Sequence, residues 1–201
     1  FAGVDAVVHL AGLANDPSCD LDPAMTQDVN VDAAVELAQC AQRAGVSRFV
    51  LASSCSVYGQ GAHEFLDEES PMNPVSAYAQ SKVEAEAAIL GMQSETFTPV
   101  AARMATLFGW SRRMRYDLAV NQMTATAVAS DVIKVMGGGK QWRPFVHVRD
   151  AARAFRLMLE APASAVSGEA FNVGADEKNV QITELAKRVA QVLPGVEVQQ
   201  Q

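Results

Sequence analysis

Cysteine is scarce in this sequence of 201 residues, which contains only Cys19, Cys40 and Cys55. The number is odd, and no two of the three form a C-x-x-C pair. Both facts argue against a disulfide framework and against a zinc site built on such pairs. We expect reduced thiols, and therefore a cytoplasmic protein without a bound metal.

An excess of positive charge and long apolar runs are also lacking. The net charge of −7 argues against a nucleic acid or an anionic membrane as a partner, although a few local arginines can still hold a small anion. No apolar run approaches the roughly 20 residues of a membrane span. The opening stretch FAGVDAVVHLAG lacks the basic region of a signal peptide.

The first residue is not methionine. Phe1 stands almost directly before a strand-like run, and the last residues, GVEVQQQ, resemble the middle of another strand. We expect a fragment of a longer chain, cut at both ends. A chain of 201 residues is long enough for one domain with a core, or for one domain and a small annex.

Apolar strands alternate with helices along the chain, and the strands lack clean period-2 patterning. This pattern is typical of an α/β protein whose parallel sheet is covered on both faces. Thr183 is expected to cap the last helix. The predicted strands are 5–12, 48–54, 98–105, 132–136, 144–148 and 170–174, and the predicted helices are 31–44, 77–91, 118–129, 150–159 and 183–193.

Two candidate site segments follow predicted strands. HLAGLA places Gly12 after the first strand, where open α/β sheets bind ligands, although it could equally be a plain strand-ending turn. LASSCSVYG places serines after the second strand. Their hydroxyls can bind a substrate oxygen, or they can cap a helix or satisfy a loop. His9 and His63 are assigned no catalytic role.

The stretch SAYAQSK places Tyr78 and Lys82 four residues apart at the start of a predicted helix. Residues at this spacing lie on one helix face, about 5–6 Å apart between their Cβ atoms. An ammonium group there favours the phenolate, lowering the tyrosine pKa so that the side chain can take a proton from a substrate hydroxyl. The alternative is an ordinary exposed pair.

Taken together, these segments resemble the extended short-chain dehydrogenase/reductase superfamily, in its sugar-nucleotide epimerase/dehydratase branch. The resemblance implies a Rossmann-like doubly wound parallel sheet with part of a small substrate-binding domain. It implies an NAD-binding domain at 1–110 that is incomplete at its N-terminus, and substrate-binding segments mixed with returning sheet elements at 111–201. The matching stretches are VVHLAG, NVDAAVELAQCAQRAGVSRFVLASSCSVYG, PVSAYAQSK, RPFVHVRDAARAF and GEAFNVG.

The resemblance also implies roles for individual residues. Tyr78 is the general base, Lys82 lowers its pKa and binds the nicotinamide ribose, and Ser54 orients the reacting sugar oxygen. Asn30 is matched to the cofactor site but could only tie loops together, and Arg143 could be a surface charge. The implied cofactor is NAD, with NADP left open. The implied cofactor-binding residues are Leu10, Ala11, Gly12, Asn30, Ser53, Tyr78, Lys82, Arg103 and Ala105, and the implied substrate-binding residues are Ser54, Thr106, Asn121 and Arg143.

Departures from the family pattern reduce the set of reactions and substrates that the resemblance implies. Cys55 and Ser56 stand where 4,6-dehydratases carry acidic residues, so a 4-epimerase is favoured. Ala14 and the pair Met104–Ala105 replace residues of galactose epimerases, so UDP-galactose is not implied as the substrate. A reductase, a decarboxylase and an exo-glycal-forming dehydratase remain open, as does a non-catalytic dinucleotide-binding relative.

The glycine-rich loop of the family is not found in these residues, because the glycines at 137–139 follow no suitable βαβ start. We therefore do not expect the 201 residues to be active by themselves. The resemblance also implies a homodimer with a nucleotide-sugar substrate.

Overall fold

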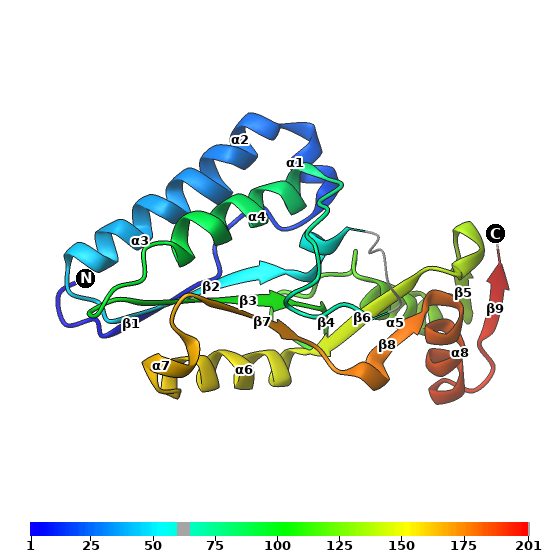
Figure 1. Cartoon of the computed structure of the whole chain (residues 1–201). Coiled ribbons are helices and arrows are strands. Elements are labelled where there is room, and N and C mark those ends of the chain that lie inside the picture. Colours follow the sequence, from blue (N-terminus) through cyan, green and yellow to red (C-terminus); the bar gives the residue numbers. More distant parts are fainter. Residues whose placement is uncertain (60–64, 201) are drawn as a thin grey trace. The chain divides into compact units, whose positions relative to one another are not determined.

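The structure is a computed structural model that describes residues 1–59 and 65–200 (Figure 1). His63 lies outside the described residues. The chain divides into two compact units, the first made of residues 1–104 and 152–173 and the second of residues 105–151 and 174–201.

The first unit is built on a four-stranded sheet with the order β1-β2-β3-β7, in which every neighbouring pair is parallel. Its strands are β1 (Ala6–His9), β2 (Arg48–Ser54), β3 (Thr98–Met104) and β7 (Glu169–Val173). Burial explains the missing alternation of polar residues, since every residue of β3 is buried. The α/β class with a parallel sheet is thereby confirmed.

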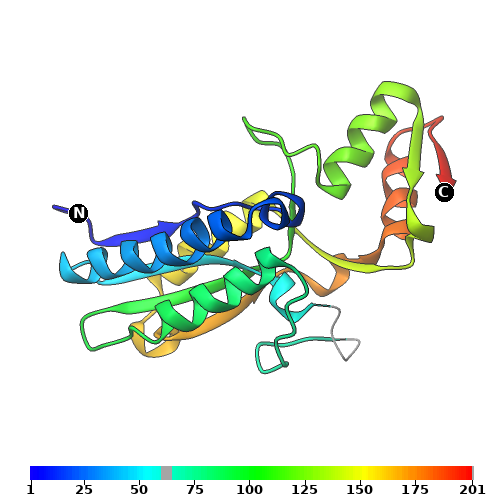
Figure 2. The ribbon, with the colours of Figure 1, turned by 90° about the horizontal axis from the view of Figure 1, so that it is seen from above.

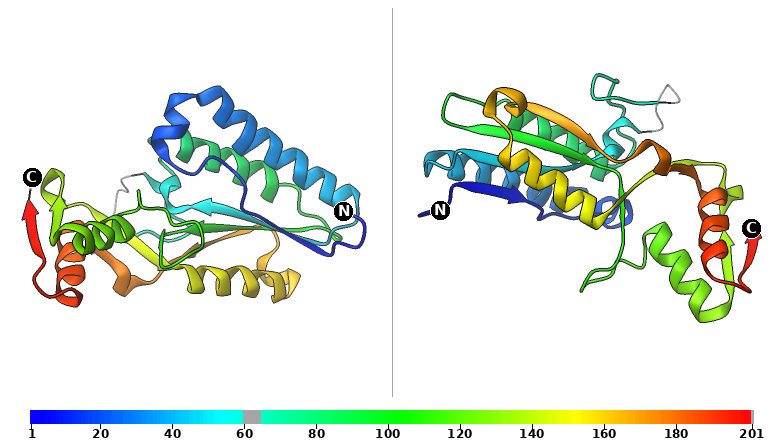
Figure 3. Two further views of the ribbon diagram at one scale, coloured as in Figure 1. Left: turned by 180° about the vertical axis from the view of Figure 1, so that it is seen from behind. Right: turned by 90° about the horizontal axis from the view of Figure 1, so that it is seen from below.

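Helices cover both faces of this sheet. Helices α3 (Ala33–Arg43) and α4 (Ala77–Leu90) lie side by side on one face, while α6 (Val148–Glu160) and α7 (Ala163–Val166) lie on the other (Figures 1, 2 and 3). Between the sheet and α3 and α4 is an apolar core formed by Ala34, Ala38, Ala41, Val46, Phe49, Leu51, Ala85, Ile89 and Phe97.

Two short helices were not predicted from the sequence. Helix α1 (Asp16–Leu21) is capped by Asn15, and α2 (Pro23–Gln27) by Asp22, whose side chain accepts a hydrogen bond from Met25 N at 3.0 Å. A π-helical turn, η1 (Asp28–Asp32), joins α2 to α3. Asx residues followed by proline are a helix-start signal, and the segment NDPSCDLDPAM contains that signal twice.

The second unit contains two small sheets. Strand β6 (Trp142–His147) pairs parallel with β4 (Thr106–Phe108) and antiparallel with β8 (Asn179–Gln181), so this unit is not purely parallel. Strands β5 (Val132–Val135) and β9 (Glu197–Gln200) form a parallel pair. The unit's core, shared with helices α5 (Ala119–Ser130) and α8 (Ile182–Val192), includes Met123, Ala127, Ile133, Val135, Phe145, Leu185 and Ala186.

Two predicted boundaries are wrong. Helix α6 begins at Val148, which had been predicted to lie in the preceding strand. Helix α8 has Gln181 at its N-cap position, and the Thr183 hydroxyl donates to Gly139 O at 3.1 Å instead of capping the helix. The competing acceptor is supplied by a distant turn, η3 (Gly137–Gly139), which the local sequence does not reveal. A further short turn, η4 (Asp176–Lys178), precedes β8, and η2 (Cys55–Tyr58) follows β2.

The η3 turn provides a stability prediction with an internal control. Gly138 and Gly139 both have positive φ, 72° and 64°, but a Cβ on Gly139 would clash with Thr183 Oγ1 and Val135 Cγ1, whereas one on Gly138 would meet nothing within 4 Å. Both alanine variants should lose about 1–2 kcal/mol from the left-handed backbone. Gly139→Ala should lose about 1–3 kcal/mol more from overpacking.

Urea unfolding of the two variants measures this difference. Equal free energies of unfolding for Gly138→Ala and Gly139→Ala would show that the close approach at Gly139 carries no cost.

Candidate functional site

The carboxyl ends of β1, β2 and β3 lie at one edge of the first unit's sheet, because the three strands are parallel. Ser54 and Met104 are paired at the ends of β2 and β3. Ligands of open α/β sheets bind at this edge. The predicted residues that lie along it are Leu10, Ala11, Gly12, Ser53, Ser54 and Arg103.

Helix α4 begins at the same site, and helix α1 holds its first turn. Ser76 is the N-cap of α4: its Oγ accepts from Ala79 N at 3.2 Å and donates to Asp16 Oδ1 at 2.6 Å. Asp20 Oδ1 accepts from Ala77 N at 3.2 Å. Two carboxylates from α1 thus lie at the positive end of the α4 dipole, directly beside Tyr78.

Tyr78 is half-buried and interacts with Ser54. Burial raises the pKa of the Tyr78 phenol, and a hydrogen bond with Ser54 opposes that shift. The nearby Cys55, Cys19 and Asp16 raise it further. Ser54 Oγ also accepts from Ser56 N at 3.2 Å, which orients the serine in the turn after β2.

Lys82 lies one helical turn after Tyr78 and is buried, with 7% of its surface exposed. Its Nζ lies 5.7 Å from the centre of the Tyr78 ring and donates to Ala52 O at 3.0 Å. Burial lowers the pKa of Lys82, while Cys19 and Glu86 raise it. The structure therefore brings Ser54, Tyr78 and Lys82 together.

The direction of the Tyr78 shift differs from that predicted from the Tyr78–Lys82 spacing. That spacing predicts a lowered pKa, whereas the pKa of Tyr78 is raised, because burial of the phenol outweighs the groups that favour its charged form. The Lys82 ammonium is directed to a backbone carbonyl of β2. Spacing alone could not show how deeply the pair is buried.

Asn30 ties the loop after β1 to helix α4. Its Oδ1 accepts from Leu13 N at 2.8 Å, and its Nδ2 donates to Leu13 O and to Ser81 Oγ, each at 3.1 Å. Gly12 lies against this amide, because a Cβ on Gly12 would be 2.8 Å from Asn30 Oδ1 and 3.9 Å from Lys82 Nζ. The loop-tying alternative for Asn30 is thereby observed, and its contact with a cofactor stays a prediction.

Ser53 and Arg103 belong to a buried polar group that we call the Glu86 network, defined as Ser53, Tyr58, Glu86 and Arg103. Glu86, only 1% exposed, accepts from Ser53 Oγ and forms an ion pair with Arg103 at 2.9 Å. Arg103 also donates to the Tyr58 hydroxyl at 2.9 Å. The role of Arg103 in cofactor binding stays a prediction, and its guanidinium is already engaged by these partners.

The same network holds the loop that leads into α4. Arg103 donates to Glu68 O at 3.2 Å, and Glu68 Oε1 accepts from Asn172 N at 2.6 Å. Tyr58 donates to Asn172 Oδ1 at 2.8 Å. Sequence reasoning missed Glu86, although it lies four residues after Lys82 on the same helix face, and this spacing could have identified it.

The remaining predicted residues, Ala105, Thr106, Asn121 and Arg143, lie in the second unit. Asn121 is buried in α5, and its side-chain amide donates to Arg115 O at 3.0 Å. Arg143 is exposed on β6, where its Nη1 donates to Trp142 O at 3.1 Å. Asn121 thus holds the loop before α5, whereas the Arg143 guanidinium faces solvent.

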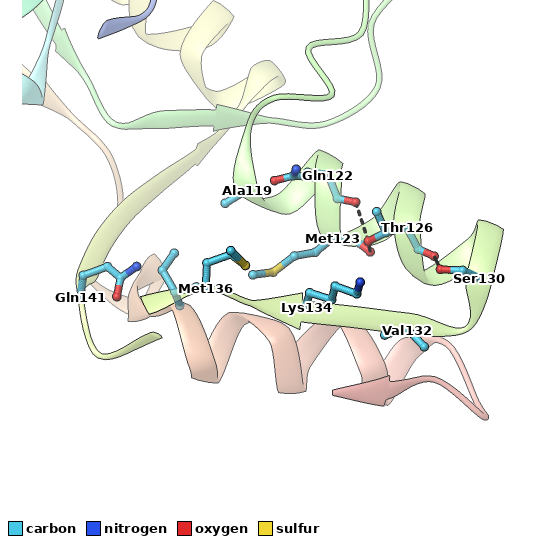
Figure 4. A pocket seen from close by; sticks show the side chains of 10 residues that line it. Ala119, Gln122, Met123, Thr126, Ser130, Val132, Lys134, Met136 and Gln141 are labelled. Atoms are coloured by element: carbon cyan, nitrogen blue, oxygen red, sulfur yellow. Dashed lines mark hydrogen bonds between the residues drawn. The ribbon is translucent and has the colours of Figure 1, made fainter. Parts of the chain in front are cut away.

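A groove of about 620 Å³ lies between α5 and β5 in the second unit (Figure 4). The thioethers of Met123 and Met136 lie near its middle, and Lys134 points into it from the strand. Methionine side chains make an adaptable apolar wall that suits a flat ring. Its lining residues are Ala119, Gln122, Met123, Thr126, Ser130, Val132, Lys134, Met136, Gln141 and Ile182.

Neither a membrane-spanning helix nor a metal-binding cluster is found in the described residues. No helix in the part of the chain that the structure describes is long and apolar enough to cross a membrane. Among residues 1–59 and 65–200, no group of three or more His, Cys, Asp or Glu side chains could hold a metal ion.

The Asn30 contacts generate a prediction. In Asn30→Asp, an oxygen replaces the Nδ2 donor to Leu13 O and Ser81 Oγ, so the buried carboxylate loses two hydrogen bonds and faces a carbonyl oxygen. The free energy of unfolding should fall by at least about 1–3 kcal/mol. Chemical denaturation at pH 7 measures the loss.

Asn15→Asp is the matched control, because the half-buried Asn15 caps its helix through Oδ1, which accepts from Ser18 N at 2.8 Å. Aspartate keeps that acceptor at a helix N-terminus, so the control should change stability by less than about 0.5 kcal/mol. A similar small change in Asn30→Asp would contradict the role of the amide.

Known proteins resemble this chain over most of its length. The model of the family described as "NAD dependent epimerase/dehydratase family" matches residues 1–174. UDP-glucose 4-epimerase of Mycolicibacterium smegmatis is 32% identical over 174 residues, covering 85% of this chain and 54% of that protein. The mouse dTDP-D-glucose 4,6-dehydratase is 26% identical over 191 residues, covering 94% and 52% respectively.

Among solved structures, MoeE5 in complex with UDP-glucose and NAD superposes with a TM-score of 0.85 at 27% identity. The match covers 98% of this chain and 65% of that one. The chain spans about half the length of the curated relatives it matches. Because the family model extends over residues 1–174 and the strands and helices have the arrangement of its solved relatives, this chain belongs to the NAD-dependent epimerase/dehydratase family.

Proposed function

We propose that this chain supplies the proton-transfer centre of an NAD-dependent nucleotide-sugar epimerase, acting at C4 of the sugar. The observation that carries the proposal is the cluster of Ser54, Tyr78 and Lys82 at the carboxyl edge of a parallel sheet. A phenol that hydrogen-bonds with a serine and lies beside a buried ammonium is suited to move a proton to and from a substrate hydroxyl.

Each of the three residues has a distinct part in the proposal. Tyr78 takes the proton of the sugar hydroxyl and later returns it, while Ser54 binds the same sugar oxygen. NAD, when bound, supplies the acceptor for the hydride that leaves the sugar carbon and returns to its opposite face. Burial raises the pKa of Tyr78, and the hydrogen bond with Ser54 lowers it. The proposal assigns the remaining stabilisation of the phenolate to the charge of Lys82.

The residues along the sheet edge fit one part of NAD. Leu10 is 64% exposed, and Gly12 has no side chain to cover the backbone after β1. A Cβ on Gly12 would lie 3.9 Å from Lys82 Nζ. Such a bare backbone beside an ammonium suits the ribose and pyrophosphate of a dinucleotide. We propose that NAD, with NADP as the alternative, is held by Leu10, Ala11, Gly12, Asn30, Ser53, Tyr78, Lys82, Arg103 and Ala105.

The second unit offers sites for the nucleotide part of the substrate. We place the diphosphate at Arg143 and Asn121, since a guanidinium fork matches phosphate oxygens. Asn121 is followed directly by Gln122 and Met123, which line the groove of Figure 4. The groove then takes the base, with its flat faces against methionine side chains and its edges near Gln122, Lys134 and Gln141. Thr106 is proposed to contact the sugar.

The 4-epimerase assignment rests on the two residues after Ser54. Cys55 and Ser56 are both half-buried, and neither can act as a strong acid for the elimination of water. A decarboxylase, a reductase or an exo-glycal-forming dehydratase shares the oxidation step and remains the alternative, as does a non-catalytic dinucleotide-binding relative.

We further propose that the full-length protein is a homodimer in the cytoplasm.

The role of Tyr78 predicts the behaviour of Tyr78→Phe in the full-length protein. Loss of the phenolic proton should lower kcat by about 10²- to 10⁴-fold, while the Kd for UDP-sugars changes little. NMR analysis of the sugar product measures turnover, and calorimetry measures binding. Tyr116→Phe is the control, because Tyr116 is 59% exposed and has no proposed role.

A Tyr78→Phe variant that turns over substrate as fast as the wild type would contradict the proposed proton transfer by Tyr78. A wild-type protein that binds NAD but turns over no UDP-, GDP-, dTDP- or CDP-sugar would instead favour the non-catalytic alternative.

The diphosphate site makes a separate prediction. Arg143→Gln should weaken the binding of UDP about 10- to 100-fold, as expected for loss of a charge-assisted hydrogen bond of about 1.5–3 kcal/mol. The effect should shrink at high salt, since the site is exposed. Arg188→Gln is the control, because Arg188 is an exposed arginine of the same unit and is paired with Glu184 at 3.2 Å. Equal affinities for UDP in the two variants would show Arg143 to be a surface charge.

A further inference from the structure

The packing of α4 on β2 changes character toward the active-site edge. Phe49 and Leu51 of β2 lie in the apolar core with Ala85 and Ile89 of α4. Side chains alternate along a strand, so the next position on that face after Leu51 is Ser53. Ser53 donates to Glu86, and Glu86 pairs with Arg103 of β3. The apolar contact is thus replaced by a charged one at the end nearest Tyr78.

A buried ion pair is a costly way to fill this position. Glu86 is 1% exposed and Arg103 is 4% exposed, so both charges have lost their hydration. Removing two charges from water often costs more than their attraction returns, and apolar side chains of similar volume are frequently as stable or more so. Stability alone therefore does not account for the pair.

The contacts of the pair suggest what it does instead. Glu86 Oε1 binds Ser53, the residue directly before Ser54, and Glu86 lies two helical turns after Tyr78. Arg103 donates to Tyr58 at 2.9 Å and to Glu68 O at 3.2 Å, in the loop that leads into α4. These directional bonds join the serine end of β2, the C-terminal half of α4 and the loop that precedes the helix, whereas apolar contacts would allow sliding between them.

We propose that Glu86 and Arg103 are positioning residues that fix α4 against the end of β2, and so set the hydrogen bond between Ser54 and Tyr78. The inference rests on the proposed function for its effect on turnover. Neither residue touches the reacting atoms. A misplacement of about 1 Å at a reacting group can cost about a hundredfold in rate, so a small shift of α4 is enough to matter.

The test replaces the pair by apolar side chains in the double variant Glu86→Met/Arg103→Met of the full-length protein. The Tm should stay the same or rise, since no unpaired charge remains. The kcat, measured at saturating NAD, should fall about a hundredfold, with an unchanged KM for the nucleotide sugar. The single variant Glu86→Gln should lower the Tm, because it leaves the Arg103 charge buried without its partner.

A second measurement does not depend on turnover. NMR with tyrosine labelled at its phenolic carbon reports the pKa of Tyr78 directly. The Ser54 hydrogen bond lowers that pKa against the effect of burial, so its loss in the double variant should raise the pKa of Tyr78 above that of the wild type. The control is Arg156→Gln/Glu160→Gln, an exposed pair at 2.8 Å on α6, which should alter neither Tm, kcat nor pKa.

The outcomes separate this inference from the proposed function. An active wild type with an equally active double variant and an unmoved Tyr78 pKa overturns the positioning role and leaves the function standing. A change confined to the Kd for NAD, with an unchanged kcat at saturating NAD, also overturns it, because the pair would then act on cofactor binding alone. An inactive wild type whose Tyr78 pKa still rises in the double variant supports the positioning role and counts against the function.

Discussion

The contact between α4 and β2 organises the first unit, because one helix face serves both the core and the site. At one end Ala85 and Ile89 pack on Phe49 and Leu51, and apolar burial supplies the stabilisation. At the other end Lys82 donates to a β2 carbonyl and Glu86 binds Ser53, so polar bonds decide the geometry. The helix that closes the core therefore also aims Tyr78.

Polar groups at this edge are connected to one another by hydrogen bonds. Asn30 links the loop after β1 to Ser81 of α4, and Asp16 and Asp20 of α1 hold the first turn of the same helix. Each link joins α4 to a different segment of the first unit. Such connections limit the freedom of the helix that carries Tyr78, and a preorganised side chain does not have to be reordered during a reaction.

Much of the fold could be predicted because the signals are local. The apolar run RFVLASS predicts a strand over 48–54, and β2 has those bounds. The alanine- and glutamate-rich segment after Ser76 predicts α4 to within one residue. Prediction was wrong where a residue distant in the sequence determines the hydrogen bond of a side chain. The Thr183 hydroxyl donates to the Gly139 carbonyl instead of capping its own helix. It also overlooked α1, although the signal for that helix is in the sequence.

By itself the sequence predicted which groups carry chemistry. It determined that Tyr78 and Lys82 share a helix face, because a period of 3.6 residues follows from the backbone. It also determined the parallel α/β class. Only the tertiary structure decided the burial, the pKa shifts and the hydrogen-bond partners of those groups. Burial raises the pKa of Tyr78, Lys82 turns to a strand carbonyl, and Arg103 is engaged by Glu86. The physical reason is that desolvation and pairing depend on neighbours brought together by folding, which no local pattern contains.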